Sequence, residues 1–152
     1  MTQPIREHEI AVEVPLAADA TLAFIGRIET PWTRREECPR RGRLDGPDCT
    51  LVIDPPWERA LDGIEAFDML DVLYWLHHSR RDLVRQNPGH TDRPRGTFAL
   101  RSPIRPNPIG LSRVRLIRRE GNRLVVRGLD CMTGTPLLDI KPETCPGTEP
   151  AG

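Results

Sequence analysis

Short runs of apolar residues, several of them alternating with polar ones, predict a chain built mainly of β-strands. Apolar and polar residues alternate over residues 9–14, and a second apolar run covers residues 22–28. Both patterns are typical of strands, because successive side chains of a strand point to opposite faces of its sheet. Residues 51–53 predict a third strand, and the uninterrupted apolar run at residues 72–76 predicts a strand buried on both faces.

The second half of the chain predicts a β-hairpin. Residues 111–119 and 123–129 flank the turn formed by residues 120–122, and alternation places Val114 and Leu124 on one shared face. The opposite face carries four arginines, namely Arg113, Arg115, Arg123 and Arg127. Because like charges on neighbouring strands repel each other, this face needs acidic neighbours, a bound anion or simply solvent.

The remaining segments complete a small β-rich fold. Ile64, Phe67 and Leu70 recur at helical spacing and predict a short helix, whereas the polar residues 79–95 predict a flexible loop. Residues 96–100 and 137–140 predict strands, and residues 130–136 predict a turn. The expected fold is mainly β, a single small closed or nearly closed β-barrel with one short helix and long loops, formed by residues 1–142. Residues 143–152, rich in Pro, Thr, Gly and Glu, are expected to be a disordered tail.

Residues 101–110, RSPIRPNPIG, form a segment that we call the proline ribbon. It has three prolines within six residues. Each proline fixes φ at about −65° and has no N–H, so the segment can be neither helix interior nor a central strand. The sequence therefore predicts a stiff segment whose carbonyl groups and arginine side chains are free to contact a ligand.

Charge divides the chain unevenly. The formal net charge is zero, yet residues 79–127 contain thirteen arginines against three acidic residues. Such a segment suits an anionic partner, and a nucleic acid draws its sequence-independent affinity from phosphate contacts. A solvated loop and an arginine-rich genome composition are the plainer explanations.

Several classes of protein are disfavoured by the sequence. It has no apolar run of about 18 residues or more and no signal peptide, so we expect a soluble, cytoplasmic protein without a membrane partner. The four cysteines form no C-x-x-C pair, which predicts no metal site. The glycine-rich nucleotide-binding and hydrolase motifs are also absent.

The strand GTFALR, the proline ribbon and the later stretch LDCMTGTPLLDIKP together form a pattern that resembles the TsaA-like family, the TrmO-type tRNA methyltransferases. The matching stretches are residues 26–28, 30–31, 38–40, 63–67, 76–77, 96–110 and 129–142. The resemblance implies a small β-barrel that binds S-adenosylmethionine, forms a homodimer and methylates the N6 nitrogen of threonylcarbamoyladenosine beside a tRNA anticodon. It places cofactor contacts at Pro39, Arg40, Arg41, His77, His78, Arg101, Leu111, Asp130, Cys131, Met132 and Thr133.

These residue types suit the ligands. An arginine at Arg101 can pair with a carboxylate of the methyl donor or of the acceptor, and Asp130 can accept hydrogen bonds from ribose hydroxyls. Asp130 and Asp139 are candidate proton acceptors, with Lys141 orienting a carbonyl or carboxylate group. The candidate RNA-binding residues are Arg80, Arg81, Arg85, Arg93, Arg95 and Arg105.

Alternatives stay open at this point. His77 could instead be a histidine at the edge of the core, bonded to backbone. The protein could be a methyltransferase of the same fold that acts on another small or RNA-borne acceptor, or a barrel that binds RNA or an adenosyl ligand without catalysis.

Overall fold

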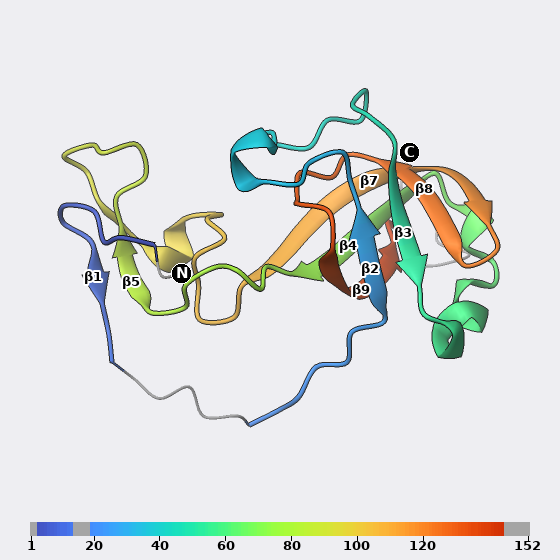
Figure 1. The fold of residues 1–152 in the computed structure, drawn as a ribbon, viewed down its shortest axis with the longest axis horizontal. Coiled ribbons are helices and arrows are strands. Elements are labelled where there is room, and N and C mark those ends of the chain that lie inside the picture. Colours follow the sequence, from blue (N-terminus) through green and yellow to red (C-terminus); the bar gives the residue numbers. More distant parts are fainter. Residues whose placement is uncertain (1–2, 14–18, 145–152) are drawn as a thin grey trace. The chain divides into compact units, whose positions relative to one another are not determined.

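A computed structural model describes residues 3–13 and 19–144 of the chain (Figure 1). The expected disordered tail therefore falls largely outside the described residues, which end at residue 144. The chain divides into two compact units. We call Ala23–Tyr74 with Leu111–Gly152 the barrel unit, and Met1–Leu22 with Trp75–Gly110 the small-sheet unit.

The barrel unit confirms the expected mainly β fold. Its closed barrel has the strand order β2-β3-β8-β7-β4-β9 (Figure 1). The strands are β2 Gly26–Glu29, β3 Cys49–Ile53, β4 Met69–Trp75, β7 Ile109–Glu120, β8 Arg123–Arg127 and β9 Thr135–Pro142. Strand β8 pairs antiparallel with both β3 and β7, and β9 pairs antiparallel with both β2 and β4.

Inward-facing aliphatic side chains fill the barrel. Ile28, Leu51, Val72, Val114 and Leu124 are all completely buried. The expectation that residues 72–76 are buried on both faces is wrong, because β4 alternates between buried and half-buried positions along its whole length. A closed barrel gives every strand one inner and one outer face, so apolar residues on β4 can also lie on the outside.

The predicted hairpin is confirmed as β7 and β8. Strand β8 pairs with β7 from Glu120↔Arg123 to Arg115↔Arg127, with a bulge near the middle. Acidic residues pair with arginines on the outer face of the hairpin: Arg113 Nε lies 3.0 Å from Asp71 Oδ1, and Arg127 Nε lies 2.6 Å from Asp48 Oδ1. Each of these exposed ion pairs adds little stability, but together they offset the repulsion between the arginines.

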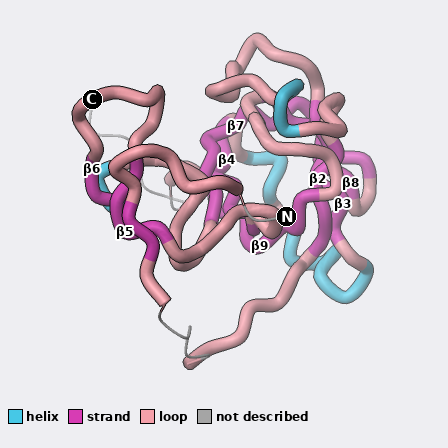
Figure 2. Tube along the Cα trace, turned by 60° about the vertical axis from the view of Figure 1, so that its left-hand side comes forward, coloured by secondary structure: helices cyan, strands magenta, loops and turns pink. Residues whose placement is uncertain are grey.

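The small-sheet unit holds a three-stranded antiparallel sheet in the order β1-β5-β6. Its strands are β1 Ile10–Ala11, β5 Leu83–Gln86 and β6 Arg95–Gly96, and β5 and β6 lie side by side in Figure 2. The flexible loop expected over residues 79–95 is wrong at β5, because this strand buries Leu83 and the polar Gln86 and so lacks the usual alternation. The strand expected at residues 96–100 is also wrong, since Thr97–Ala99 form the short 3₁₀ helix η4.

The other helices are short as well. They are the 3₁₀ helices η1 Arg35–Glu37, η2 Pro55–Leu61 and η3 Ile64–Ala66. The helix predicted from Ile64, Phe67 and Leu70 is present only as η3, because Met69 already begins β4 and Leu70 points into the barrel core. Within the described residues, the structure contains no helix with the length and apolarity needed to cross a bilayer.

Candidate functional site

A hydrogen-bonded chain of three side chains fixes Asp130 in the barrel unit. The buried Tyr74 donates its hydroxyl proton to Asp130 Oδ1 at 3.0 Å, and its oxygen lies 2.7 Å from Ser112 Oγ. Because a phenol has one proton, Ser112 must be the donor to Tyr74. Burial raises the pKa of Tyr74, and the negative charge of Asp130 raises it further, so the phenol stays a neutral donor.

Asp130 is thereby held in one orientation, with one carboxylate oxygen still able to accept a hydrogen bond. The residue is only half-buried, and no donor from the described residues contacts its Oδ2 atom. An ionised carboxylate oriented in this way can accept a hydrogen bond from a ligand hydroxyl or ammonium group. Tyr74 and Ser112 were not among the predicted site residues, although a buried tyrosine on a strand usually has a partner for its hydroxyl.

The turn after Asp130 is pinned to the segment that follows β2. Thr30 donates its hydroxyl proton to the Cys131 carbonyl at 2.8 Å, and its backbone N–H donates to Thr133 Oγ1 at 3.2 Å. The backbone N–H of Thr133 donates to the Trp32 carbonyl, 2.8 Å away. Burial raises the pKa of Cys131 to about 12, which makes its thiol unreactive. The carbonyl of Met132 accepts a hydrogen bond from Thr135 Oγ1 at 2.6 Å.

The loop that carries Pro39, Arg40 and Arg41 lies against the segment that leads into Asp130. A β-carbon on Gly42 would lie 1.8 Å from the Gly128 carbonyl oxygen, so only glycine permits this approach. Burial raises the pKa of Cys38, the residue before Pro39, and the charge of Asp130 raises it further. Arg40 and Arg41 are exposed, and neither side chain is bonded to another described residue.

The other two candidate catalytic residues lie apart from Asp130. In the pairing of β4 with β9, Asp139 lies opposite Leu73 and Lys141 lies opposite Asp71, which places both on the outer face, away from Tyr74. Lys141 Nζ lies 3.3 Å from Asp139 Oδ2. Leu111 is also in the barrel unit, next to Ser112, and its side chain is exposed.

The small-sheet unit holds the remaining predicted residues. The imidazole rings of His77 and His78 lie in contact, with their centroids 3.7 Å apart and their planes tilted by 41°. Both residues are exposed, so His77 does not lie at the edge of the core, although its side chain has a backbone hydrogen bond with Trp75 as that alternative expected. Partial desolvation lowers the pKa of His77, and the neighbouring His78 lowers it further. Arg101 is exposed, and no described residue pairs with its guanidinium group.

The carbonyl groups of the proline ribbon are less available to a ligand than the sequence predicts. Some of its carbonyl groups are bonded within its own unit: Arg105 Nη1 donates to Ser102 at 3.0 Å, and also to Leu100, the residue before the ribbon, at 2.9 Å. Arg81 Nε donates to the Pro106 carbonyl at 2.6 Å, while its guanidinium carbon lies 5.2 Å from the centre of the Trp75 ring. The prediction of free carbonyl groups is therefore wrong at Ser102 and Pro106, because Arg105 and Arg81 donate to them.

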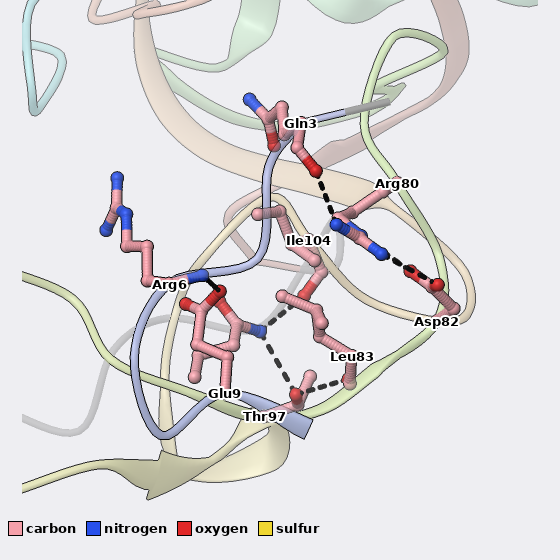
Figure 3. A network of polar contacts seen from close by, with 9 residues as sticks. Gln3, Arg6, Glu9, Arg80, Asp82, Leu83, Thr97 and Ile104 are labelled. Atoms are coloured by element: carbon pink, nitrogen blue, oxygen red, sulfur yellow. Dashed lines mark hydrogen bonds and ion pairs between the residues drawn. The ribbon is translucent and has the colours of Figure 1, made fainter. Parts of the chain in front are cut away.

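The six candidate RNA-binding arginines fall into two groups. Arg80 pairs with Asp82 through two bonds, at 2.7 and 2.9 Å, and also donates to the Gln3 carbonyl (Figure 3). Only 7% of its side chain is exposed, and Arg81 and Arg105 are held as described above. The other three are exposed and lack an ion pair or side-chain hydrogen bond to any described residue; we call Arg85, Arg93 and Arg95 the unpaired loop arginines.

Comparison with known sequences gives a consistent result. The family model of the tRNA-methyltransferase O N-terminal domain matches residues 27–145. VirR of Rhizobium radiobacter, a probable S-adenosyl-L-methionine-binding protein, is 53% identical over 139 residues, which cover 91% of this chain and 79% of that protein. RcsF of Pseudomonas aeruginosa, a putative S-adenosylmethionine-dependent methyltransferase, is 37% identical over 125 residues, which cover 78% of this chain and 54% of RcsF.

Solved structures agree with this match. TrmO from Pseudomonas aeruginosa is 31% identical with a TM-score of 0.68, over 88% of this chain and 60% of that chain. A second crystal structure of TrmO is 33% identical with a TM-score of 0.68, over 88% of this chain and 62% of that chain. This chain thus spans 60–62% of the length of these two solved chains.

Proposed function

Since this chain belongs to the family of the tRNA-methyltransferase O N-terminal domain, we propose that it is an S-adenosylmethionine-dependent methyltransferase. Its proposed acceptor is the N6 nitrogen of threonylcarbamoyladenosine beside a tRNA anticodon. The observation that carries the proposal is the oriented carboxylate of Asp130, held by Tyr74 in a barrel whose relatives are named as S-adenosylmethionine-binding proteins.

The side chains present suit the proposed cofactor. Asp130 can accept hydrogen bonds from ribose hydroxyls, and the exposed guanidinium group of Arg101 can pair with a carboxylate. When it is bound, S-adenosylmethionine supplies a methyl group activated by a sulfonium charge. Methyl transfer is a displacement at carbon, so the protein contributes mainly alignment and the exclusion of water.

Asp130 is also the better candidate for accepting the proton that leaves the acceptor nitrogen. Its Oδ2 atom has no partner among the described residues, whereas Asp139 is already paired with Lys141 on the outer face of the barrel. A proton acceptor must lie within hydrogen-bond reach of the group that it deprotonates. We therefore propose Asp130, rather than Asp139 with Lys141, as the proton acceptor.

The proposed tRNA contact rests on the unpaired loop arginines. A guanidinium group that already pairs with a carboxylate has little to offer a phosphate, so the paired Arg80 is a poor candidate. The unpaired loop arginines lie on or beside β5 and β6 and can neutralise phosphate groups.

The proposed homodimer rests on apolar side chains of the small-sheet unit. Ile10 is 48% exposed, Val84 is 45% exposed and Phe98 is 83% exposed. A contiguous group of exposed large apolar side chains marks an interaction surface, and we propose that these residues form one for a second copy of the chain.

Ligand binding tests the proposal directly. Isothermal titration calorimetry should detect binding of S-adenosylhomocysteine, and a ligand at about 100 times its Kd should add about 2.7 kcal/mol to the free energy of unfolding. The variant Asp130→Asn should bind more weakly, whereas the matched variant Asp139→Asn should bind nearly as well as the wild type. An absence of binding by the wild type would contradict the proposal.

The acceptor needs a separate experiment. Purified protein is incubated with S-adenosylmethionine and tRNA that carries threonylcarbamoyladenosine, and the nucleosides are then examined by mass spectrometry. A gain of one methyl group on that nucleoside is the expected result. Methylation of another nucleoside would keep the enzyme class and replace the acceptor, and binding without any transfer would leave a non-catalytic adenosyl-binding barrel.

A further inference from the structure

Several backbone carbonyl groups of the proline ribbon are already hydrogen-bonded within the small-sheet unit. Besides the bonds from Arg81 and Arg105, the Pro108 carbonyl accepts the backbone N–H of Leu76 at 2.8 Å. The Ile104 carbonyl accepts a hydrogen bond from Gln86 Nε2, also at 2.8 Å. These bonds occupy the carbonyl groups of Ser102, Ile104, Pro106, Asn107 and Pro108, and they leave the exposed side chain of Arg101 as the ribbon's charged group for a ligand.

Gln86 is the buried side chain that ties the ribbon to the sheet. It lies on β5 and is 4% exposed, and its amide nitrogen donates to both Ile104 and Thr97 Oγ1, the latter at 3.0 Å. The Thr97 hydroxyl donates to the Leu83 carbonyl at 2.6 Å (Figure 3). Because a hydroxyl has one proton, Thr97 can only accept from Gln86, so both amide protons of Gln86 are used.

The segment that Gln86 holds is stiff on its own. Arg105 closes it through two bonds to Leu100 and Ser102, and the Ser102 hydroxyl accepts the backbone N–H of Ile104 at 3.2 Å. Pro103 fixes φ in its middle. The ribbon is tied to the rest of its unit at Ile104, Pro106 and Pro108, and of these three anchors the one at Ile104 is nearest in the chain to Arg101.

We infer that Gln86 is a positioning residue that places Arg101 to pair with the carboxylate of a ligand. The inference rests on the proposed function, because that function supplies the ligand. Two sources of this carboxylate are open: the amino-acid group of the methyl donor and the threonyl group of the acceptor. Gln86 touches neither ligand and acts only through the ribbon.

Two substitutions at this position separate the effect of the donor protons from that of side-chain size. Gln86→Met keeps the approximate length and removes both donors. Gln86→Glu keeps the shape but turns a carboxylate toward the Ile104 carbonyl, which cannot donate, so its effect should be at least as large. Asp92→Asn, on the exposed loop between β5 and β6, serves as the control and should behave as the wild type.

The assay compares ligands with and without the amino-acid group that carries the carboxylate. Calorimetry measures binding of S-adenosylhomocysteine and of 5′-methylthioadenosine, which has no amino-acid group. Gln86→Met should raise the Kd for S-adenosylhomocysteine by about tenfold and change the Kd for 5′-methylthioadenosine by less than about twofold. A merely structural loss would weaken the two ligands equally. Arg101→Ala should have the same selectivity, and adding Gln86→Met to it should change little.

A second pair of ligands covers the acceptor. Threonylcarbamoyladenosine is compared with its methyl ester, and selective weakening of the free acid alone would identify the acceptor as the source of the carboxylate. If the Gln86 variants bind both members of each ligand pair as the wild type does, or lose the same affinity for both members, the inference is wrong. If the variants at Gln86 do not fold, Thr97→Val removes one of the two bonds and should give a smaller effect of the same selectivity. If the wild type binds no adenosyl compound, the proposed function fails, and the inference fails with it.

Discussion

Replacing Tyr74 with phenylalanine tests the hydrogen-bonded chain that orients Asp130. The substitution removes only the hydroxyl group, which donates to Asp130 at 3.0 Å and lies 2.7 Å from Ser112 Oγ. A hydrogen bond to a charged group contributes about 1.5–3 kcal/mol to stability, and a neutral one about 1 kcal/mol. Because Asp130 is only half-buried, water can replace part of the loss, and we expect a net cost of about 2 kcal/mol.

The expected effect is measurable by two methods. For a chain of this size, about 2 kcal/mol lowers the melting temperature by about 4–8 °C. The carboxylate of Asp130 also gains rotational freedom that ligand binding must remove again, at about 0.5–1.5 kcal/mol, so the Kd for S-adenosylhomocysteine should rise by about two- to tenfold.

Ser112→Ala is the matched control for this substitution. It keeps the bond between Tyr74 and Asp130 and should cost about 1 kcal/mol with little change in ligand affinity. Measured together, the two substitutions should be non-additive, because they remove parts of one network. If Tyr74→Phe melts with the wild type and binds the ligand equally well, the reasoning about Asp130 is refuted.

Three further predictions concern the small-sheet unit. Replacing all unpaired loop arginines with glutamine should reduce the slope of log tRNA affinity against log salt concentration by about two to three. Arg80→Gln should lower the melting temperature and leave that slope unchanged. Equal slopes in both variants would contradict the division into two groups. Nuclear magnetic resonance should show a pKa of His77 below the usual 6.5, and His78→Gln should raise this pKa without restoring 6.5, because desolvation is the larger cause. Since folding lowers the pKa of His77, the contribution of this residue to stability is present above pH 6.5 and is lost as the pH falls toward the pKa of the folded state. A normal titration of His77 would contradict the assignment. Phe98→Ser should shift the protein toward the monomer in light scattering coupled to size-exclusion chromatography, and an unchanged mass would place any dimer contact elsewhere.

Local patterns in the sequence predicted the hairpin and several other strands of the barrel. Strand β8 and the inner face of β7 followed from alternation, and the turn at Gly121 followed from the residues between them. These features depend on residues close together in the chain, so their signal survives in one sequence. The same rules failed at β5, where the polar Gln86 is buried and breaks the alternation.

The tertiary structure alone decided which polar groups are already bonded. Tyr74 finds Asp130 across 56 positions of the chain, and Gln86 finds Ile104 across 18. Composition gave Arg80, Arg81 and Arg105 the same chemistry as Arg85, yet the first three are bonded to their own unit and Arg85 is not. The partner of a polar side chain comes from wherever folding brings a donor or acceptor within about 3 Å, and no local pattern encodes that distance.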